Sequence, residues 1–398
     1  MIKILLIEDL ESEIKPITKL LTTDFESVVT RVDSLLDAVK VMESAWIRPD
    51  LIICDDHGSS FTPLSRMLEL SQGVPCILIV DDPTKFSEFR KIKQAFLTEP
   101  VARKHLTRDL LSRIENLEEE GMFVHLAKDG SLDPRSKKII TVQEQKVQKL
   151  IETPKPNIQT VHNTTTNSIK LIQEVTSKIG FTPQVQAIAT KSVELTLKVI
   201  ADSPKLSEIL KTLKTQEGKF IASHSMMLAE IASALASQME WSSGATFTKL
   251  CLAAFLHDLT LTNNELARCR TLEEAKALPG ITQYELNQFK LHPTHAAELA
   301  RKFHEIPADV DTIIAQHHEL PGGTGFPRGL FQSQISPLTC VFIVAEDLLH
   351  FYLDRDFRAD ALQFVKEREN IYVSGNLRRA LKVLENESTA MNKATSFS

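Results

Sequence analysis

The sequence has few cysteines, no long apolar run and no marked excess of charge of either sign. Its five cysteines are scattered and form no Cys-x-x-Cys pair, which excludes a disulfide framework and predicts reduced thiols in a core. A net charge of -6 excludes a general electrostatic attraction to nucleic acid or to anionic lipid. The segment MIKILLIEDLESE lacks the pattern of a signal peptide or a membrane span. We therefore expect a cytoplasmic protein with no nucleic-acid or membrane partner.

The first part of the chain, residues 1–115, alternates short apolar runs with amphipathic segments. The runs IKILLIE, PDLIICDD and VPCILIV are apolar enough for strands that are buried on both faces. Such strands, separated by helices, predict a parallel sheet in a doubly wound α/β domain. Glu8 and Asp9 follow the first run, and Asp55 and Asp56 follow the second. Because the carboxyl ends of parallel strands meet at one edge, these carboxylates suit a hard cation such as Mg²⁺.

With these acids in place, the domain resembles a response-regulator receiver domain, which has a flavodoxin-like fold. The resemblance implies that Asp55 is the phospho-acceptor and that Glu8 and Asp9 are the acidic pair. It fails at two positions, where Val80 replaces a Ser or Thr and Glu99 replaces a Lys. A carboxylate at the second position would repel a phosphoryl group, so we interpret the domain as a degenerate pseudo-receiver. The alternative is a plain dimerisation or docking module, and a dimerisation module would give a homodimer.

The rest of the 398-residue chain divides into three parts. Residues 116–167 have the Pro, Asn and Thr content of an exposed connector, with a short hairpin around an Asp-Gly pair. Residues 168–386 have apolar residues at every third or fourth position, which predicts an all-α domain. Residues 387–398 are predicted to be disordered. The sequence thus predicts a multidomain protein.

Two doublets in the helical part carry its chemistry. His257-Asp258 lies in KLCLAAFLHDLTL, and His317-His318 ends VDTIIAQHHEL. A carboxylate in a run this apolar is costly to bury without a compensating cation or donor. Imidazole and carboxylate are suitable ligands for Fe, Mn, Zn or Ni, and the set is larger than one ion needs. In chain order, the candidate metal ligands are His224, His257, Asp258, His292, His317, His318 and either Glu346 or Asp347.

Most of these residues also have a plain structural interpretation. A single histidine such as His224, on an apolar helical face, is typical of a hydrogen-bonded core residue. His292 would cap a helix started by Pro293, since proline suits the first helical position. The His317-His318 doublet would lie on the surface. Asp258 is harder to explain by a plain structural role, because apolar residues share its helical face.

The order of the motifs, HS, HD, HP, HHE and GxGxP, resembles the HD-GYP family of cyclic di-GMP phosphodiesterases over roughly residues 185–370. The resemblance implies an all-α HD-domain helical bundle in which His257 and Asp258 form the catalytic centre and the candidate ligands hold metal. The last ligand in the family is an Asp. Here VAEDLL places Glu346 at that position, with Asp347 as the competing residue.

The neighbours of the ligands depart from the family pattern. Trinuclear members have a carboxylate where this chain has Phe220, so we expect two divalent ions, with Fe or Mn favoured. Leu261, Leu320, Gly322 and Phe326 stand where the family has a lysine, an arginine-type residue, an acid and a tyrosine. Each change removes a donor or a charge, and loss of one such group costs on the order of 10²-fold in rate.

The loop PGGTGFPRGL retains groups that suit a nucleotide. Gly323 and Gly325 allow close approach of the backbone to a ligand. Phe326 keeps an aromatic face for stacking on guanine. Arg328 is the remaining cation for a phosphate, with a solvated loop arginine as the alternative. In the family this loop is a surface for GGDEF-type cyclases, which makes such signalling proteins the expected partners.

The sequence therefore predicts a bacterial signalling protein with a receiver-like domain, a connector and a dinuclear HD-GYP-type domain. We expect weak hydrolysis of cyclic di-GMP to linear pGpG or GMP, with the metals activating water for in-line attack on phosphorus. One alternative is a catalytically inactive sensor or scaffold that binds metal, cyclic di-GMP or a partner protein. Another is an HD phosphohydrolase that acts on a different nucleotide.

Overall fold

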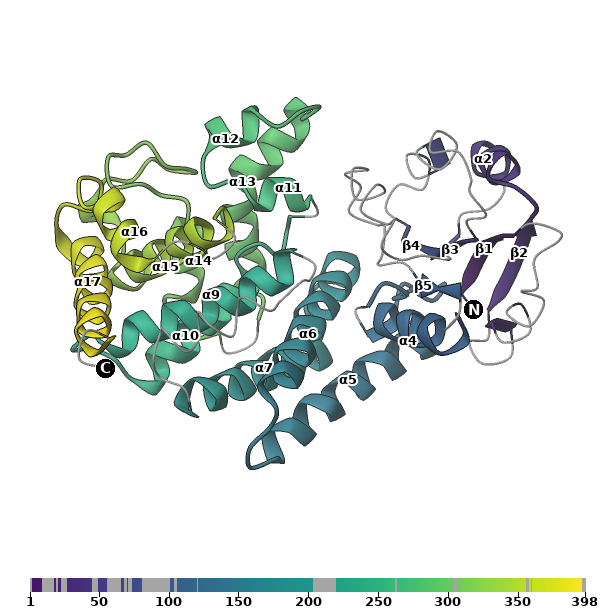
Figure 1. Ribbon diagram of the computed structural model, residues 1–398, viewed down its shortest axis with the longest axis horizontal. Coiled ribbons are helices and arrows are strands. Elements are labelled where there is room, and N and C mark those ends of the chain that lie inside the picture. The colour runs from purple at the N-terminus through teal and green to yellow at the C-terminus, as the bar shows by residue number, and fades with distance from the viewer. Residues whose placement is uncertain are drawn as a thin grey trace. The chain divides into compact units, whose positions relative to one another are not determined.

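The computed structural model describes residues 2–8, 18, 21–22, 27–44, 49–55, 66–67, 70, 74–80, 101–103, 106–119, 121–202, 220–261, 263–303, 306–355, 358 and 360–395. The chain forms two compact units, Met1–His125 and Leu126–Ser398 (Figure 1). All five cysteines are buried thiols, as the sequence predicts. Among the described helices, none combines the length and the apolarity needed to cross a membrane.

The first unit contains a sheet of five parallel strands. Their order across the sheet is β2-β1-β3-β4-β5, an arrangement found among doubly wound α/β folds. The strands β1, β3 and β4 are almost entirely apolar and buried, which explains their central positions. The bounds are β1 (Lys3–Ile7), β2 (Val28–Val32), β3 (Leu51–Asp55), β4 (Cys76–Val80) and β5 (Val101–Ala102).

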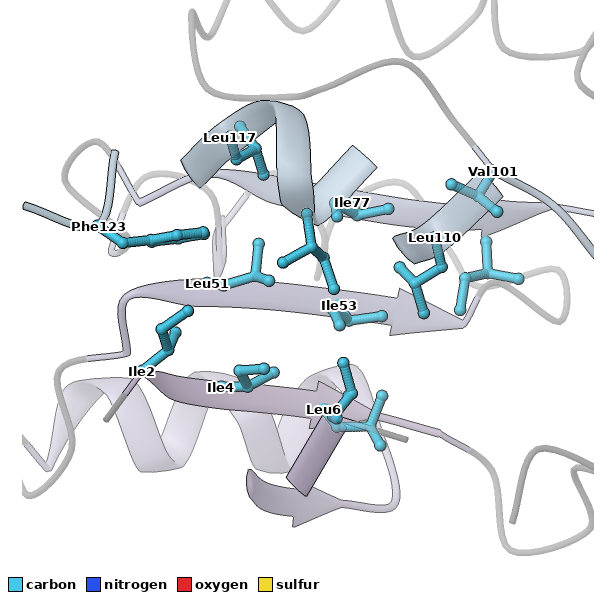
Figure 2. Close-up of a cluster of buried hydrophobic side chains, with 13 residues drawn as sticks. Ile2, Ile4, Leu6, Leu51, Ile53, Ile77, Val101, Leu110, Leu117 and Phe123 are labelled. Carbon is cyan, nitrogen blue, oxygen red and sulfur yellow. The ribbon is translucent and has the colours of Figure 1, made fainter. Parts of the chain in front are cut away.

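Successive strand residues point to opposite faces of this sheet, and a helix packs on each face. Figure 2 shows one face, where Ile4, Leu6 and Ile53 of the strands meet Leu110 and Leu117 of α4 (Leu106–Glu119). On the other face the alternate strand residues meet α2 (Leu35–Glu43). The predicted parallel sheet is confirmed, and the two covering helices agree with an α/β domain.

The second unit is helical (Figure 1). Helix α9 packs against α10 and α15, α14 packs against α10 and α13, and α17 covers α15. Polar side chains cap several helices, including Ser243 before α10 and Thr282, with Glu285, in a capping box before α13. The helices are α5 (Pro134–Glu152), α6 (Ile158–Ile179), α7 (Pro183–Asp202), α9 (Phe220–Ser237), α10 (Gly244–Leu256), α11 (Asn264–Ala267), α12 (Leu272–Lys276), α13 (Gln283–Ala300), α14 (Val310–Gln316), α15 (Pro337–Leu353), α16 (Ala361–Arg368) and α17 (Gly375–Thr395), with the 3-10 turn η3 (Gln332–Gln334).

The segment expected to be an exposed connector is largely helical. It contains α5 and the first turns of α6, although an antiparallel bridge between Leu126 and Leu132 does enclose the Asp-Gly pair. The polar sequence is misleading because α6 buries one face. Val161 and His162 are buried there, and His162 Nε2 lies 2.7 Å from Glu230 Oε1 of α9. A buried imidazole–carboxylate pair therefore joins the connector to the helix that carries His224.

The end of the chain also differs from expectation. Helix α17 continues to Thr395, so the described part of the segment 387–398 is assigned as helix. The reason lies in the preceding turns, where Leu377, Ala380, Leu381 and Leu384 are buried and fix the direction of the helix.

Lys170 gives a test of the packing of α6. Its side chain is 9% exposed, and burial lowers its pKa to about 7, with Glu174 opposing the shift. Above the folded pKa the unfolded chain still binds a proton that the folded chain does not, so stability rises with pH between about 7 and 10.5. We predict that Lys170→Met raises the free energy of unfolding near pH 7. The gain should shrink towards pH 10.

Urea unfolding of both proteins across this pH range measures the effect. One pKa unit corresponds to about 1.4 kcal/mol, so the gain at low pH should be on the order of several kcal/mol. Lys178→Met, which replaces an exposed lysine of the same helix, is the matched control and should change little. Parallel pH profiles for Lys170→Met and the unsubstituted protein would contradict the prediction.

Candidate functional site

The doublet His257-Asp258 lies directly after the C-terminus of α10. The last carbonyls of a helix have no partner within it, and one of them is used here. His257 Nδ1 lies 2.8 Å from the Ala254 carbonyl oxygen. A carbonyl only accepts, so Nδ1 carries the proton and Nε2 is left as the metal-binding nitrogen. The end of α10 thus fixes both the direction and the tautomer of the ring.

His317 repeats this arrangement at the end of α14, where its Nδ1 lies 2.7 Å from the Ile314 carbonyl oxygen. His292 achieves it in the middle of a helix. Pro293 has no N–H and therefore frees the carbonyl of Phe289, four residues before it. His292 Nδ1 lies 2.6 Å from that oxygen. Since Pro293 lies inside α13, the alternative in which His292 caps a helix started by the proline is wrong.

Six of the predicted ligands form two groups of three, which we name the first and second groups. Within each group, one ligand atom per residue lies within 4.8 Å of the others. Every member is buried, so the surface alternative for the second doublet is wrong. The first group is His224, His257 and Glu346, and the second group is His292, His317 and His318.

Asp258 contacts both groups. Its Oδ2 lies 3.2 Å from His257 Nε2, and its Oδ1 lies 3.3 Å from His292 Nε2 and 3.9 Å from His317 Nε2. The side chain is buried, which alone would raise its pKa, but His257 and His292 hold the pKa well below the ordinary value. The carboxylate is therefore ionised and has one oxygen for each group.

The acids and imidazoles of the first group attract positive charge. Burial lowers the pKa of His257, but the carboxylates of Asp258 and Glu346 outweigh it and raise the pKa to about 9. Glu346 Oε1 lies 3.8 Å from His224 Nε2 and 3.9 Å from His257 Nε2. Although burial opposes it, His224 and the other rings lower the pKa of Glu346. At neutral pH and without a metal ion, the first group thus pairs the ionised Glu346 with a protonated His257.

The second group contains a contact that needs a cation. His292 Nε2 lies 3.1 Å from His317 Nε2. Because both Nδ1 atoms face carbonyls, two neutral rings would direct their Nε2 lone pairs at each other. Burial lowers the pKa of His317 to about 4 and that of His318 well below its usual value, which disfavours a proton on either of these two rings. Neutral imidazoles are the form that binds transition metals, so the donor set fits a metal ion.

The structure separates Glu346 from its neighbour. Glu346 faces the first group, whereas Asp347 accepts hydrogen bonds from Arg368 Nε at 2.7 Å and from Tyr372 Oη at 2.9 Å. Adjacent helical residues diverge by about 100° around the axis, which places the two acids in different surroundings. The geometry therefore favours Glu346 over Asp347 as the ligand.

Two residues near the site were not identified from the sequence. His350 lies one turn after Glu346 on α15, and its ring centroid is 5.0 Å from that of His224. Burial lowers its pKa to about 3. Glu319, buried directly after the second doublet, accepts backbone N–H groups of Arg328 at 2.9 Å and Leu330 at 2.7 Å. The one-turn spacing and the HHE motif were the available signals for these two residues.

The glycine loop lies against the second group, but its aromatic residue is placed differently from our expectation. The Phe326 ring stacks on His318, with centroids 4.4 Å apart, and is 3% exposed. Phe289 and Leu261 belong to the same apolar cluster. Phe326 therefore packs in the interior and does not present a face to guanine. The Arg328 side chain is exposed, and Gly323 has a positive φ of 72°.

The acids of the first unit are paired with arginines. Glu8 Oε1 lies 2.6 Å from Arg31 Nε, and Asp55 Oδ2 accepts from Arg103 Nη1 at 2.9 Å, with a second bond from Nη2. Burial raises the pKa of Glu8 despite Arg31. Arg103, just after β5, thus supplies a cation that sequence inspection did not find. Asp9, Asp56 and Glu99 lie outside the described residues.

Three comparisons with known proteins gave matches. Residues 194–368 match the family model of the HD domain. A cyclic di-GMP phosphodiesterase of Pseudomonas aeruginosa is 26% identical over 166 residues, which span 42% of this chain and 38% of the relative. An HDG"Y"P protein from Bdellovibrio bacteriovorus has a solved structure that covers 64% of this chain and 82% of its own, with 18% identity and a TM-score of 0.46.

The glycine loop gives a prediction from steric contacts. A Cβ on Gly325 would overlap backbone atoms of His318, Glu319 and Leu320, whereas a Cβ on Gly322 would meet nothing within 4 Å. We predict that Gly325→Ala lowers the free energy of unfolding by about 1–3 kcal/mol and displaces His318. The matched variant Gly322→Ala should stay within about 0.5 kcal/mol of the unsubstituted protein. Thermal unfolding of the two variants measures the difference, and equal stability would contradict the prediction.

Proposed function

We propose that the helical unit is a metal-dependent phosphodiesterase of the HD-GYP type that hydrolyses cyclic di-GMP. The observation that carries the proposal is the Asp258 carboxylate, which contacts one histidine group with each of its oxygens. A shared carboxylate between two donor sets is the arrangement of a two-metal hydrolytic site. The HD-domain match and the similarity to a cyclic di-GMP phosphodiesterase support the same reaction class.

Each group would hold one divalent ion. His224, His257 and Glu346 would bind the first, and the three histidines of the second group would bind the other, with Asp258 as the bridge. Fe and Mn are suitable because both accept mixed imidazole and carboxylate ligands. When bound, two such ions supply Lewis-acid activation of water and of the phosphate oxygens.

The residues of the chain prepare the site for this chemistry. Carbonyl groups hold the Nδ1 protons of His257, His292 and His317, so each ring would offer Nε2 to a metal ion without reorientation. The lowered pKa values of His317 and His318 keep those two rings neutral. The buried acids remain ionised and balance the positive charge of the ions. Preorganisation of this kind lowers the cost of reaching the transition state.

The substrate side of the site is less well equipped, so we propose slow turnover. Leu261 and Phe326 lie in an apolar cluster next to the second group and offer no donor to a phosphate. The exposed side chain of Arg328, on the glycine loop, is the cation proposed to contact substrate, and the backbone at Gly323 and Gly325 would allow close approach.

The first unit is proposed to be a receiver-like domain that takes part in cytoplasmic signalling, with Asp55 as its acidic centre. The parallel sheet and the position of Asp55 at the end of β3 support this proposal. Arg103 binds Asp55 in bidentate fashion, so a Mg²⁺ ion would compete with this guanidinium for the carboxylate. Partner proteins of the GGDEF type and a homodimer remain predictions.

A second candidate function is a catalytically inactive sensor that binds metal or cyclic di-GMP. The observation that favours it is the burial of Phe326 against His318, which places an apolar ring where a polar group would contact substrate. Calorimetry with cyclic di-GMP distinguishes the two functions, since a sensor would bind the nucleotide without hydrolysing it.

The proposal predicts that protein loaded anaerobically with Fe²⁺ or Mn²⁺ converts cyclic di-GMP to pGpG or GMP. His257→Ala combined with Asp258→Ala should lower the rate by on the order of 10²-fold or more, because both groups lose a ligand. Chromatography of the nucleotide products and metal analysis of the protein measure the two effects. His295→Ala, on the same helix as His292 but outside both groups, should retain activity. Full loading with either metal and no product would exclude the enzyme.

Glu346→Gln tests the choice between the adjacent acids. Glutamine has the same shape but no charge, so the substitution should lower the affinity for the ion of the first group and leave the ion of the second group bound. We expect metal content to fall from two ions towards one per chain, as measured by elemental analysis after dialysis. Glu298→Gln replaces an exposed acid of α13 and should retain both ions. If Glu346→Gln also retained both, its assignment as a ligand would be wrong.

A further inference from the structure

His318 is oriented differently from the other three histidines whose Nδ1 contacts are known. His257, His292 and His317 use carbonyls three residues earlier in their own helices. His318 Nδ1 instead lies 3.1 Å from the carbonyl oxygen of Arg270, a residue 48 positions away between α11 and α12. The direction of this ring therefore depends on how that separate segment is held.

The segment is held through the Arg270 side chain. Its guanidinium forms an ion pair with Asp347 of α15, and Asp347 also accepts from Arg368 at 2.7 and 3.2 Å and from Tyr372 at 2.9 Å. Asp347 is 6% exposed, so this carboxylate is buried with two cations and a phenol around it. Charge-assisted bonds at a buried acid are strong and directional.

The backbone of the segment is fixed as well. The N–H of Arg270 donates to Glu274 Oε2 at 2.7 Å, and the Thr271 side chain caps α12 by accepting from the N–H of Glu274 at 3.1 Å. Arg270 is thus anchored at its amide and at its guanidinium, and its carbonyl between these anchors faces His318. Because the amide and the guanidinium of Arg270 are both held, the position of its carbonyl oxygen is fixed as well.

We infer that Arg270 is a positioning residue for the second metal ion, acting through His318. The inference rests on the proposed function, because it concerns one of the two ions proposed there. It also assigns a role to Asp347, which anchors Arg270 while its neighbour Glu346 faces the first group. Two consecutive acids of α15 would therefore serve the two ions, one by ligation and the other through Arg270 and His318.

The test is a titration of the metal-free protein with Mn²⁺, followed by electron paramagnetic resonance and calorimetry, with no substrate present. Arg270→Ala should lower the affinity for one of the two ions by about 10–100-fold and leave the affinity for the other unchanged. A loss of this size is typical when a residue that orients a metal ligand is removed. Arg270→Lys keeps the charge but not the fork geometry and should restore part of the lost affinity.

Asp347→Asn removes the anchor without touching Arg270 and should weaken the same ion. A variant that combines Arg270→Ala with Asp347→Asn should bind this ion about as tightly as the single variant with the lower affinity. The effects should not add, because Asp347 acts on His318 through Arg270. Arg268→Ala, at an exposed position of the same segment, is the matched control and should bind both ions normally. If Arg270→Ala does not fold, Asp347→Asn and Arg270→Lys carry the test.

The outcomes separate this inference from the proposed function. Two ions with unchanged affinity in Arg270→Ala and Asp347→Asn would overturn the inference and leave the proposed function intact. Equal weakening of both ions would also overturn it, because a general structural role affects both groups. No bound ion in the unsubstituted protein would overturn both proposals. Selective loss of one ion, with partial rescue by Arg270→Lys, is the expected result.

Discussion

The Asp258 carboxylate is the group around which the helical unit is arranged. It is ionised, 3% exposed and in contact with imidazoles from three different helices or helix ends. A buried negative charge is costly unless donors or cations surround it. Here imidazole rings whose Nε2 atoms converge on the carboxylate fill that role. The ends of α10 and α14 supply two of these rings, because their unpaired carbonyls bind the opposite nitrogens. The lengths of these helices are thus tied to the geometry of the site.

Sequence patterns identified the donors of this site but not how they are held. The doublets at 257 and 317 stand out because polar residues interrupt apolar helical sequence. The choice between Glu346 and Asp347 was not accessible, since it depends on where Arg368 and Tyr372 of α16 and the following loop lie. The contact of His318 with Arg270 joins residues 48 positions apart, a separation that no local pattern encodes.

The fold shows the same division between local and tertiary information. The parallel sheet followed from apolar runs, because strands buried on both faces have a recognisable composition. The connector was misjudged, since Asn, Thr and Pro content reflects turn propensity whereas the contact of His162 with Glu230 favours a helix. Phe326 was misjudged for a related reason. An aromatic ring without a hydroxyl gains more from packing on His318 and Phe289 than from facing solvent.

Pro293 has a consequence for how changes in this protein will be interpreted. A proline in a helix interior costs about 3 kcal/mol and interrupts the ladder of backbone bonds. In α13 the His292 imidazole bridges that interruption by bonding the Phe289 carbonyl, so the ring replaces a missing backbone donor. The same side chain therefore contributes to the mechanical continuity of a helix and to a ligand set. Conservation of His292 among relatives would not by itself indicate catalysis, because loss of the ring would weaken the helix even in a protein that never binds metal.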